Sequence, residues 1–169
     1  QALGRGRLLA DRHAVVAVLA APVLLAITVG CVLFRRAFAR PELLPEEFAL
    51  AAAWVFVVGS LVWLGVFLSG TSLLGFGAPW TWITAGHFAF AGFGALTVTS
   101  LSCRVVSNRQ ALKVLRLLLI AHPIAYLVTV AGILGLRYCD EAGAVSYVLI
   151  FAAQLAAVVF GRPSRIARG

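Results

Sequence analysis

The stretch FALAAAWVFVVGSLVWLGVFL, residues 48–68, decides the fold class of this chain. It contains no charged residue, and an apolar run of about 18 or more residues predicts a helix that crosses a membrane. At about 1.5 Å per residue, a helix of this length matches a bilayer's hydrocarbon core, which is about 30 Å thick. Because backbone polar groups inside lipid must be satisfied within the segment, and the run is too long for a strand, we expect a helix.

Four further apolar runs of similar length occur along the sequence, so five membrane-spanning helices are expected. Of the 169 residues, 62% are hydrophobic and only 12% are charged, whereas a soluble domain contains about 25% charged residues. The sequence therefore predicts one all-α domain over residues 1–169, a polytopic membrane helix bundle. The predicted spans cover residues 14–34, 48–68, 80–102, 114–136 and 144–160.

Basic residues gather at the ends of the predicted spans, where they set topology and meet anionic headgroups. Ten of them fall on one side of the membrane and four on the other. Since basic loops stay in the cytoplasm, the larger group and the C-terminus are expected there. The ten are Arg35, Arg36, Arg40, Arg104, Arg109, Lys113, Arg116, Arg162, Arg165 and Arg168, and the four are Arg5, Arg7, Arg12 and Arg137.

The charge distribution also predicts where the protein lies and what it meets. We expect an integral, multi-pass membrane protein that contacts membrane lipids. The net charge of +8 does not indicate nucleic-acid binding, because the sequence leaves no soluble surface to hold a nucleic acid. The sequence contains no methionine, so we expect that a tag, a processed segment or a further helix precedes it. A further helix would explain how three arginines come to lie in an outer N-terminal tail.

A histidine interrupts the third predicted span, in WITAGHFAFAGF, residues 82–93. His87 is expected about 10 Å below the outer end of the helix, with Thr84 and Phe90 on the same face because each is three residues away. An ionisable side chain within a membrane indicates a functional site; the alternative is a neutral histidine that bonds a neighbouring helix. Small residues on this helix allow close packing, so we expect the third span to be central. They are Ala85, Ala89 and Gly92.

The fourth predicted span carries a polar stripe, because His122, Tyr126 and Thr129 stand at positions i, i+4 and i+7. Pro123 cannot donate a hydrogen bond to the carbonyl of Leu119, so a kink is expected there. A kink beside a polar stripe is typical of a cavity border. The alternative is that the three side chains bond to neighbouring helices.

Two more side chains belong to the binding hypothesis. Gln154 lies in the middle of the fifth predicted span and must find a partner there, either a ligand or another helix. Trp54, in the second span, is either a stacking surface for a ligand or a packing or lipid-facing side chain.

His87 and His122 are not expected to share a metal ion. Counted from the ends of their helices, their rings would differ in depth by roughly 8–12 Å. This difference is too large for the two axial ligands of one haem or for a shared zinc ion, and no cysteine spacing resembles a metal site. The sequence therefore predicts no metal and no cofactor.

Glu46 and Glu47 form an acidic pair at the start of the second span, directly after Pro45. Carboxylates at a helix N-terminus interact favourably with the helix dipole, and proline suits the first turn. The alternative is catalytic: either carboxylate would donate a proton at the mouth of a pocket, held in place by Arg35 or Arg36.

The stretch LSGTSLLGFGAPWTWITAGHFAFAGFGAL, residues 68–96, resembles the signature of the YndJ-like bacterial membrane proteins. That signature has a glycine-containing turn, then a helix with threonine–alanine–x–histidine–phenylalanine followed by alanine–glycine–phenylalanine. A second histidine often occurs in it where this sequence has Ala89. The resemblance implies a multi-pass protein of the bacterial cytoplasmic membrane and brings no established activity. The matching residues are Thr84, Ala85, His87, Phe88, Ala91, Gly92 and Phe93.

The pentapeptide LPEEF, residues 44–48, resembles the proline–acid–acid pattern of the membrane lycopene cyclases, small multi-pass proteins that act on the ends of carotenoids. In those proteins the acid protonates an alkene. The resemblance implies proton donation by Glu46 or Glu47.

Two classes of function are compatible with these features. One is an enzyme or binding protein for a lipophilic molecule, isoprenoid-like or lipid-like, with acid–base isomerisation or cyclisation as its chemistry. The other is a structural or assembly subunit of a larger membrane complex, in which the polar side chains join helices. The first class assigns catalysis to His87, Glu46 and Glu47, and ligand binding to Thr84, Phe90, His122, Tyr126, Thr129, Gln154 and Trp54.

The expected topology predicts which cysteines an impermeant thiol reagent reaches from outside intact cells. Cys139 lies near the expected outer face and should be labelled, whereas Cys31 and Cys103 lie near the inner face and should not. Labelling of Cys103 without labelling of Cys139 would invert the topology.

Overall fold

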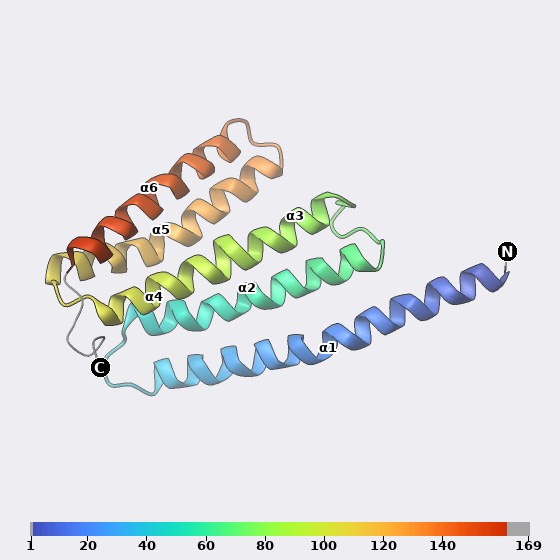
Figure 1. Ribbon diagram of the computed structural model, residues 1–169, viewed down its shortest axis with the longest axis horizontal. Coiled ribbons are helices and arrows are strands. Elements are labelled where there is room, and N and C mark those ends of the chain that lie inside the picture. The colour runs from blue at the N-terminus through green and yellow to red at the C-terminus, as the bar shows by residue number, and fades with distance from the viewer. Residues whose placement is uncertain (1, 162–169) are drawn as a thin grey trace.

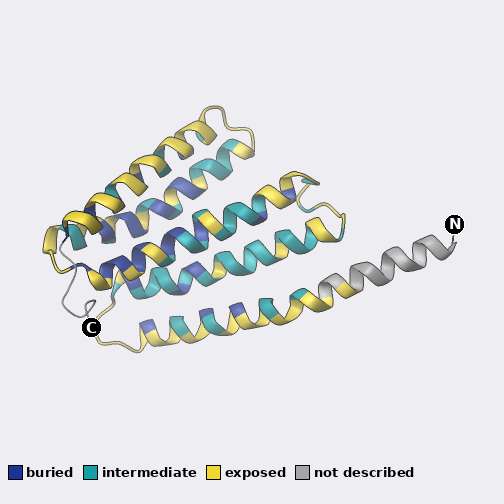
Figure 2. Cartoon of the chain, viewed as in Figure 1, coloured by how far each residue is buried: buried dark blue, intermediate teal, exposed yellow. Residues whose placement is uncertain are grey.

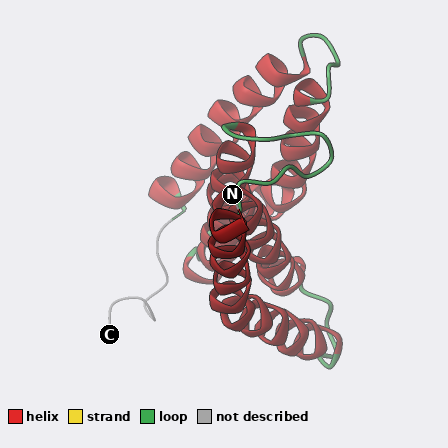
Figure 3. Ribbon diagram, turned by 90° about the vertical axis from the view of Figure 1, so that its right-hand side faces the viewer, coloured by secondary structure: helices red, strands yellow, loops and turns green. Residues whose placement is uncertain are grey.

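The computed structural model describes residues 2–161, with the side chains of Ala14 and of residues 17–161. Within residues 2–161 the chain consists of helices and connecting loops, without a strand, which confirms the all-α prediction (Figure 1, Figure 3). The helices are α1 (Ala2–Phe38), α2 (Pro45–Leu68), α3 (Trp80–His87), the π-helix η1 (Phe88–Gly94), α4 (Ala95–Val105), α5 (Arg109–Ile133) and α6 (Cys139–Phe160).

Five helical segments are long and apolar enough to cross a membrane, as the sequence predicted. The third consists of α3, η1 and α4, which follow one another without a break and are called the third span below. The fourth begins at Arg109 rather than at residue 114, because Asn108 caps it. The side chain of Asn108 accepts hydrogen bonds from the backbone N–H groups of Gln110 and Ala111, so the helix starts within a polar stretch that hydropathy alone does not assign to a span. The five segments are Ala17–Phe38, Pro45–Leu68, Trp80–Val105, Arg109–Ile133 and Cys139–Phe160.

The helices lie side by side in chain order (Figure 1). α1 packs on α2, α2 on the third span, the third span on α5, and α5 on α6. Buried residues concentrate accordingly on the third span and α5 (Figure 2). In the most apolar window of each segment, 39% of the third span is buried, against 11% for α1 and α2. The prediction that the third span is central is therefore confirmed.

Glycine residues let α2 and the third span approach closely. A Cβ atom at Gly92 would fall on the ring of Phe56, and a Cβ atom at Gly59 would fall on the ring of Phe88. Each helix thus inserts a phenylalanine where the other has a glycine, and the two rings lie 5.8 Å apart. This is the close contact that small residues permit between membrane helices, and it includes one residue of the predicted small-residue set.

Ion pairs join the first turn of α2 to two other helices. Glu46 accepts two hydrogen bonds from the guanidinium group of Arg116 on α5, at 2.8 and 3.0 Å. Glu47 accepts one from Arg104 on α4 at 2.8 Å and lies 3.7 Å from Arg40. The prediction that Arg35 or Arg36 holds these carboxylates is wrong, because the first turn of α2 turns its acids toward α4 and α5, whereas both of those arginines lie on the edge helix α1. The partners of Glu46 and Glu47 are Arg116, Arg104 and Arg40.

Some of the arginines used for the topology prediction lie outside the described residues. The cysteine-labelling test of that topology needs a correction. Arg162, Arg165 and Arg168 lie beyond the described range, as do the side chains of Arg5, Arg7 and Arg12. Cys103 is buried, whereas Cys31 is exposed on α1 and Cys139 is half-buried. Because a buried thiol resists a reagent from either side, the labelling test needs an exposed position at the same end, for which Gln110→Cys is suited.

Replacing Gly92 by alanine should separate α2 from the third span. The added methyl group meets the Phe56 ring, so we expect the free energy of unfolding to fall by about 1–3 kcal/mol. The measurement is thermal unfolding in detergent.

Gly86→Ala is the matched control, because a Cβ atom there meets nothing within 4 Å. Alanine should stabilise the helix at this position by about 0.5–1 kcal/mol. Equal melting temperatures for the two variants would contradict the packing argument.

Candidate functional site

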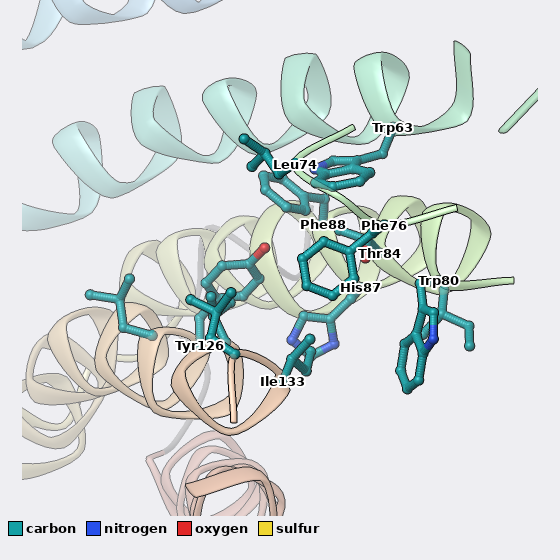
Figure 4. Close-up of a pocket in the computed structure, with 13 residues that line it drawn as sticks. Trp63, Leu74, Phe76, Trp80, Thr84, His87, Phe88, Tyr126 and Ile133 are labelled. Atoms are coloured by element: carbon teal, nitrogen blue, oxygen red, sulfur yellow. The ribbon is translucent and has the colours of Figure 1, made fainter. Parts of the chain in front are cut away.

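A cavity of about 300 Å³ lies where α2, the third span, α5 and the loop before α3 meet (Figure 4). Its wall is mostly apolar: α2 contributes Trp63, α5 contributes Leu127, Val130 and Ile133, and Leu134 follows directly after α5. The polar side chains that line it are Thr84 and His87 of α3 and Tyr126 of α5. The cavity thus gathers three of the predicted site residues in an apolar surrounding.

The loop between α2 and α3 covers one side of this cavity. Leu73 and Phe76 exchange two backbone hydrogen bonds of 3.0 Å, and between them Leu74 and Gly75 have φ angles of +54° and +84°. Two successive positive φ angles make a tight turn that is uncommon for leucine. The side chains of Leu74 and Phe76 line the cavity, although Leu74 is also 80% exposed. The turn therefore lays Leu74 and Phe76 against the cavity, although most of the Leu74 side chain stays exposed.

His87 has a buried ring nitrogen that makes no hydrogen bond within the described protein. Its Nε2 atom is buried and has no hydrogen-bond partner among the described residues. The ring packs at 5.0 Å from the ring of Tyr126, tilted by 30°, and at 6.3 Å from the ring of Tyr147. A hydrogen bond from this atom to a neighbouring helix, the alternative left open by the sequence, is not present in the described part of the chain. The hydrogen-bonding capacity of Nε2 is therefore not used by the described residues.

The helix changes its geometry directly after His87. Residues Phe88–Gly94 form the π-helix η1, and such insertions occur frequently at functional sites. The prediction that Phe90 shares the face of Thr84 and His87 assumed α-helical spacing, which the π-helix alters. Phe90 is 82% exposed and lies outside the cavity. It lines a shallow groove on the other side of His87, together with Tyr147, Phe151 and Gln154.

His122 belongs to a second polar cluster. Its Nε2 atom lies 3.1 Å from the hydroxyl oxygen of Thr99, which also lies 3.1 Å from the side-chain oxygen of Gln154. Since a hydroxyl has one proton, a protonated Nε2 of His122 donates to Thr99, and Thr99 in turn donates to Gln154 or to the Ala95 carbonyl at 2.8 Å. The cluster links the third span, α5 and α6. Protein groups thus bond Nε2 of His122 and the side chain of Gln154, whereas Nδ1 of His122 is buried without a partner among the described residues.

Of the other residues predicted to bind a ligand, one lines the cavity and two contact other parts of the protein. Tyr126 is buried, with its ring 5.1 Å from Phe56 and 5.4 Å from Phe88. The hydroxyl of Thr129 donates to the carbonyl of its own helix four residues back, at 2.9 Å, and does not line the cavity. Trp54 packs edge to face on Phe93 at 5.5 Å, also outside the cavity.

The two predicted catalytic acids do not share a site with His87. Glu46 stands at the first turn of α2, whereas Trp63, which lines the cavity, lies 17 residues further along the same helix. At about 1.5 Å per residue this is about 25 Å. Within the described residues, no group of three histidine, cysteine or acidic side chains is placed to hold a metal ion.

Sequence reasoning missed several residues that matter. Thr99, the centre of the second cluster, lies in the run TVTSLSC of small polar residues, a signal that was present in the third span. Trp63 and Trp80 line the cavity from α2 and α3, and Phe88 belongs to the matched signature. The contributions of Leu74 and Phe76 depend on the path of a loop, which no sequence period reveals.

The family model described as YndJ-like protein matches residues 2–168, nearly the whole chain. No curated protein and no solved structure matches the chain. The matched region includes both the cavity and the Thr99 cluster.

Replacing Thr99 by valine should destabilise the bundle without changing its shape. The variant leaves His122 and Gln154 without their shared partner, so we expect a loss of about 1 kcal/mol or more in the free energy of unfolding. Chemical unfolding in detergent measures it. Thr28→Val is the control, because the hydroxyl of Thr28 bonds the Leu24 carbonyl of its own exposed helix. An equal loss of stability in this variant would show that the Thr99 cluster does not stabilise the contacts between helices.

Proposed function

The chain belongs to the YndJ-like protein family and is a multi-pass membrane protein, and we propose that it binds a lipophilic molecule in the cavity that His87 lines. The observation that carries the proposal is the unpartnered Nε2 of His87 in an apolar wall. A buried polar atom without a partner costs about 1–3 kcal/mol. A hydroxyl or carbonyl group of a ligand would remove that cost.

The size of the cavity limits what it holds. About 300 Å³ is near the lower end of the range of small-molecule sites, which extends from about 300 to 1,000 Å³. The proposed occupant is therefore a small lipophilic molecule or one end of a longer isoprenoid or lipid. The aromatic rings of Trp63, Trp80 and Phe88 offer it flat apolar surfaces.

Acid–base isomerisation or cyclisation of the ligand is the finer form of this proposal. Among the described residues, the ionisable groups that line the cavity are His87 and Tyr126, and histidine is the one that titrates near neutral pH. Glu46 is paired with Arg116 about 25 Å along α2 from the cavity. The proton chemistry that we propose therefore uses His87 and not the acidic pair.

We also propose that the end of the bundle with the ion pairs faces the cytoplasm of a bacterial cell, which puts the C-terminus there too. The support is the charge distribution: Arg36, Arg40, Arg104 and Arg109 gather at that end, whereas Arg137 is at the other. The cavity then lies in the outer half of the membrane.

Replacing His87 by leucine tests the binding site. Because Nε2 makes no hydrogen bond within the described protein, the melting temperature should stay the same or rise. The amount of lipophilic molecule that organic solvent extracts from the purified protein, measured by mass spectrometry, should fall about fivefold. His87→Gln, which keeps hydrogen-bonding groups but does not titrate, should retain the ligand and abolish any proton chemistry.

Two bulky substitutions provide a matched pair for the same measurement. Thr84→Phe fills the cavity and should remove the ligand, whereas Leu101→Phe adds a ring on an exposed face of α4 and should not. A large drop in melting temperature for His87→Leu with the ligand retained would make the histidine structural. Wild-type protein that carries no such molecule but copurifies with other membrane subunits would support an assembly role instead.

A further inference from the structure

A second cavity, of about 510 Å³, lies at the opposite end of α2 from His87. It is formed where α1 ends, α2 begins and α4 ends, and it is called the arginine cradle here. Three arginines and one glutamate supply its polar wall, and leucines of α1 and α2 supply its apolar wall. These residues are Arg36, Arg40, Arg104, Glu47, Leu33 and Leu50.

The charges of the arginine cradle do not cancel. Glu47 is its one carboxylate, bonded to Arg104 at 2.8 Å and 3.7 Å from Arg40. No described acidic side chain lies within ion-pair distance of Arg36. Three guanidinium groups against one carboxylate leave two positive charges in a concave site. The neighbouring Glu46 does not reduce this excess, because it is already paired with Arg116.

Guanidinium groups bind phosphate particularly well. Their planar array of N–H donors fits two phosphate oxygens at once, with the strength of a charge-assisted hydrogen bond. Arg36, in the last turn of α1, and Arg104, in the last turn of α4, approach the arginine cradle from two helices. A group held between them would therefore bind by charge and by shape.

The apolar wall distinguishes a lipid from a free ion. Leu33 lies one turn before Arg36 on α1, and Leu50 lies one turn after Glu47 on α2. Both leucines are thus displaced from the charged residues toward the middle of the membrane-spanning helices. A phosphate with an acyl chain can place the phosphate among the arginines and the chain along the leucines.

We propose that the arginine cradle binds the phosphate headgroup of an anionic phospholipid. Basic pockets between the ends of membrane helices are suited to anionic lipid headgroups. The proposal uses none of the residues that line the His87 cavity and is independent of the function proposed for it.

The test measures lipid that stays bound to the full chain. Protein is released from nanodiscs of phosphatidylcholine alone, or of phosphatidylcholine with phosphatidylglycerol, and analysed by native mass spectrometry. Wild-type protein should retain phosphatidylglycerol in preference to phosphatidylcholine. Arg36→Gln, which breaks no ion pair in the described structure, should weaken that retention about fivefold, and Arg36→Gln with Arg40→Gln should weaken it further.

Arg109→Gln is the matched control for charge. It removes the same charge from an exposed position at the same end of the bundle, outside the arginine cradle. Retention of phosphatidylglycerol by this variant should equal that of the wild-type protein. An equal loss in Arg36→Gln and Arg109→Gln would overturn the proposal, because the attraction would then be a general surface effect.

Removing a negative charge instead of a positive one provides a second test of lipid binding by the arginine cradle. Glu47→Gln removes the negative charge of the arginine cradle and should increase retention of phosphatidylglycerol about fivefold. Glu42→Gln removes the same charge from an exposed position outside it and should leave retention unchanged. A decrease for Glu47→Gln in folded protein, or equal increases for both variants, would contradict the proposal.

An experiment with inorganic phosphate distinguishes a lipid phosphate from a free phosphate ion as the group that the arginine cradle binds. The melting temperature of the protein in detergent is measured with sodium phosphate and with sodium chloride at equal ionic strength, for the wild type and for Arg36→Gln. A lipid site predicts stabilisation by added phosphatidylglycerol that exceeds any by phosphate. If phosphatidylglycerol and phosphate stabilise the wild type equally, and Arg36→Gln loses this effect, the arginine cradle binds free phosphate. If neither compound stabilises the wild type, the proposal is overturned.

Discussion

The close contact between α2 and the third span is the constraint on which the rest of the bundle depends. In lipid, the apolar faces of helices gain little by meeting each other, so shape and polar contacts decide which helices pack. Phe56 against Gly92 and Phe88 against Gly59 provide the shape. Because Phe88 directly follows His87, the same contact fixes the histidine ring beside Tyr126 and creates the wall of the cavity.

His122 and His87 show how one residue type can have different surroundings in the same bundle. His122 is fully buried and shares the Thr99 hydroxyl with Gln154, so its polar group serves contacts between helices. The Nε2 atom of His87 is buried without such a partner. The Nδ1 atom of His122 is also buried without a partner, so unpaired ring nitrogens alone do not separate the two residues. The difference is in their surroundings, because His87 lines the cavity and His122 does not.

The sequence predicted the membrane helices well, because hydropathy is a property of each local stretch of sequence. It predicted the candidate site only in part, because contacts between helices depend on residues that are far apart in the sequence. The five spans, and His87 with Thr84 and Tyr126 in one place, follow from runs and spacings. Phe90 lines a groove with His87 but does not line the cavity that Thr84 and His87 share, and no composition signal specifies the π-helix in which it lies. The partners of Glu46 depended on how α2 is rotated against α5, which is a tertiary property.

The bundle keeps its charges and its uncharged polar groups apart along the membrane axis. At one end, Glu46 and Glu47 are bound to arginines of α4 and α5, which holds the helix ends together with strong, directional contacts. At the cavity, the polar groups are a threonine, a histidine and a tyrosine, with no carboxylate among the described lining residues. A carboxylate there would favour a charged histidine and a charged ligand. Its absence from the described wall leaves His87 in a setting that suits a neutral partner, and the ligand that we propose is of that kind.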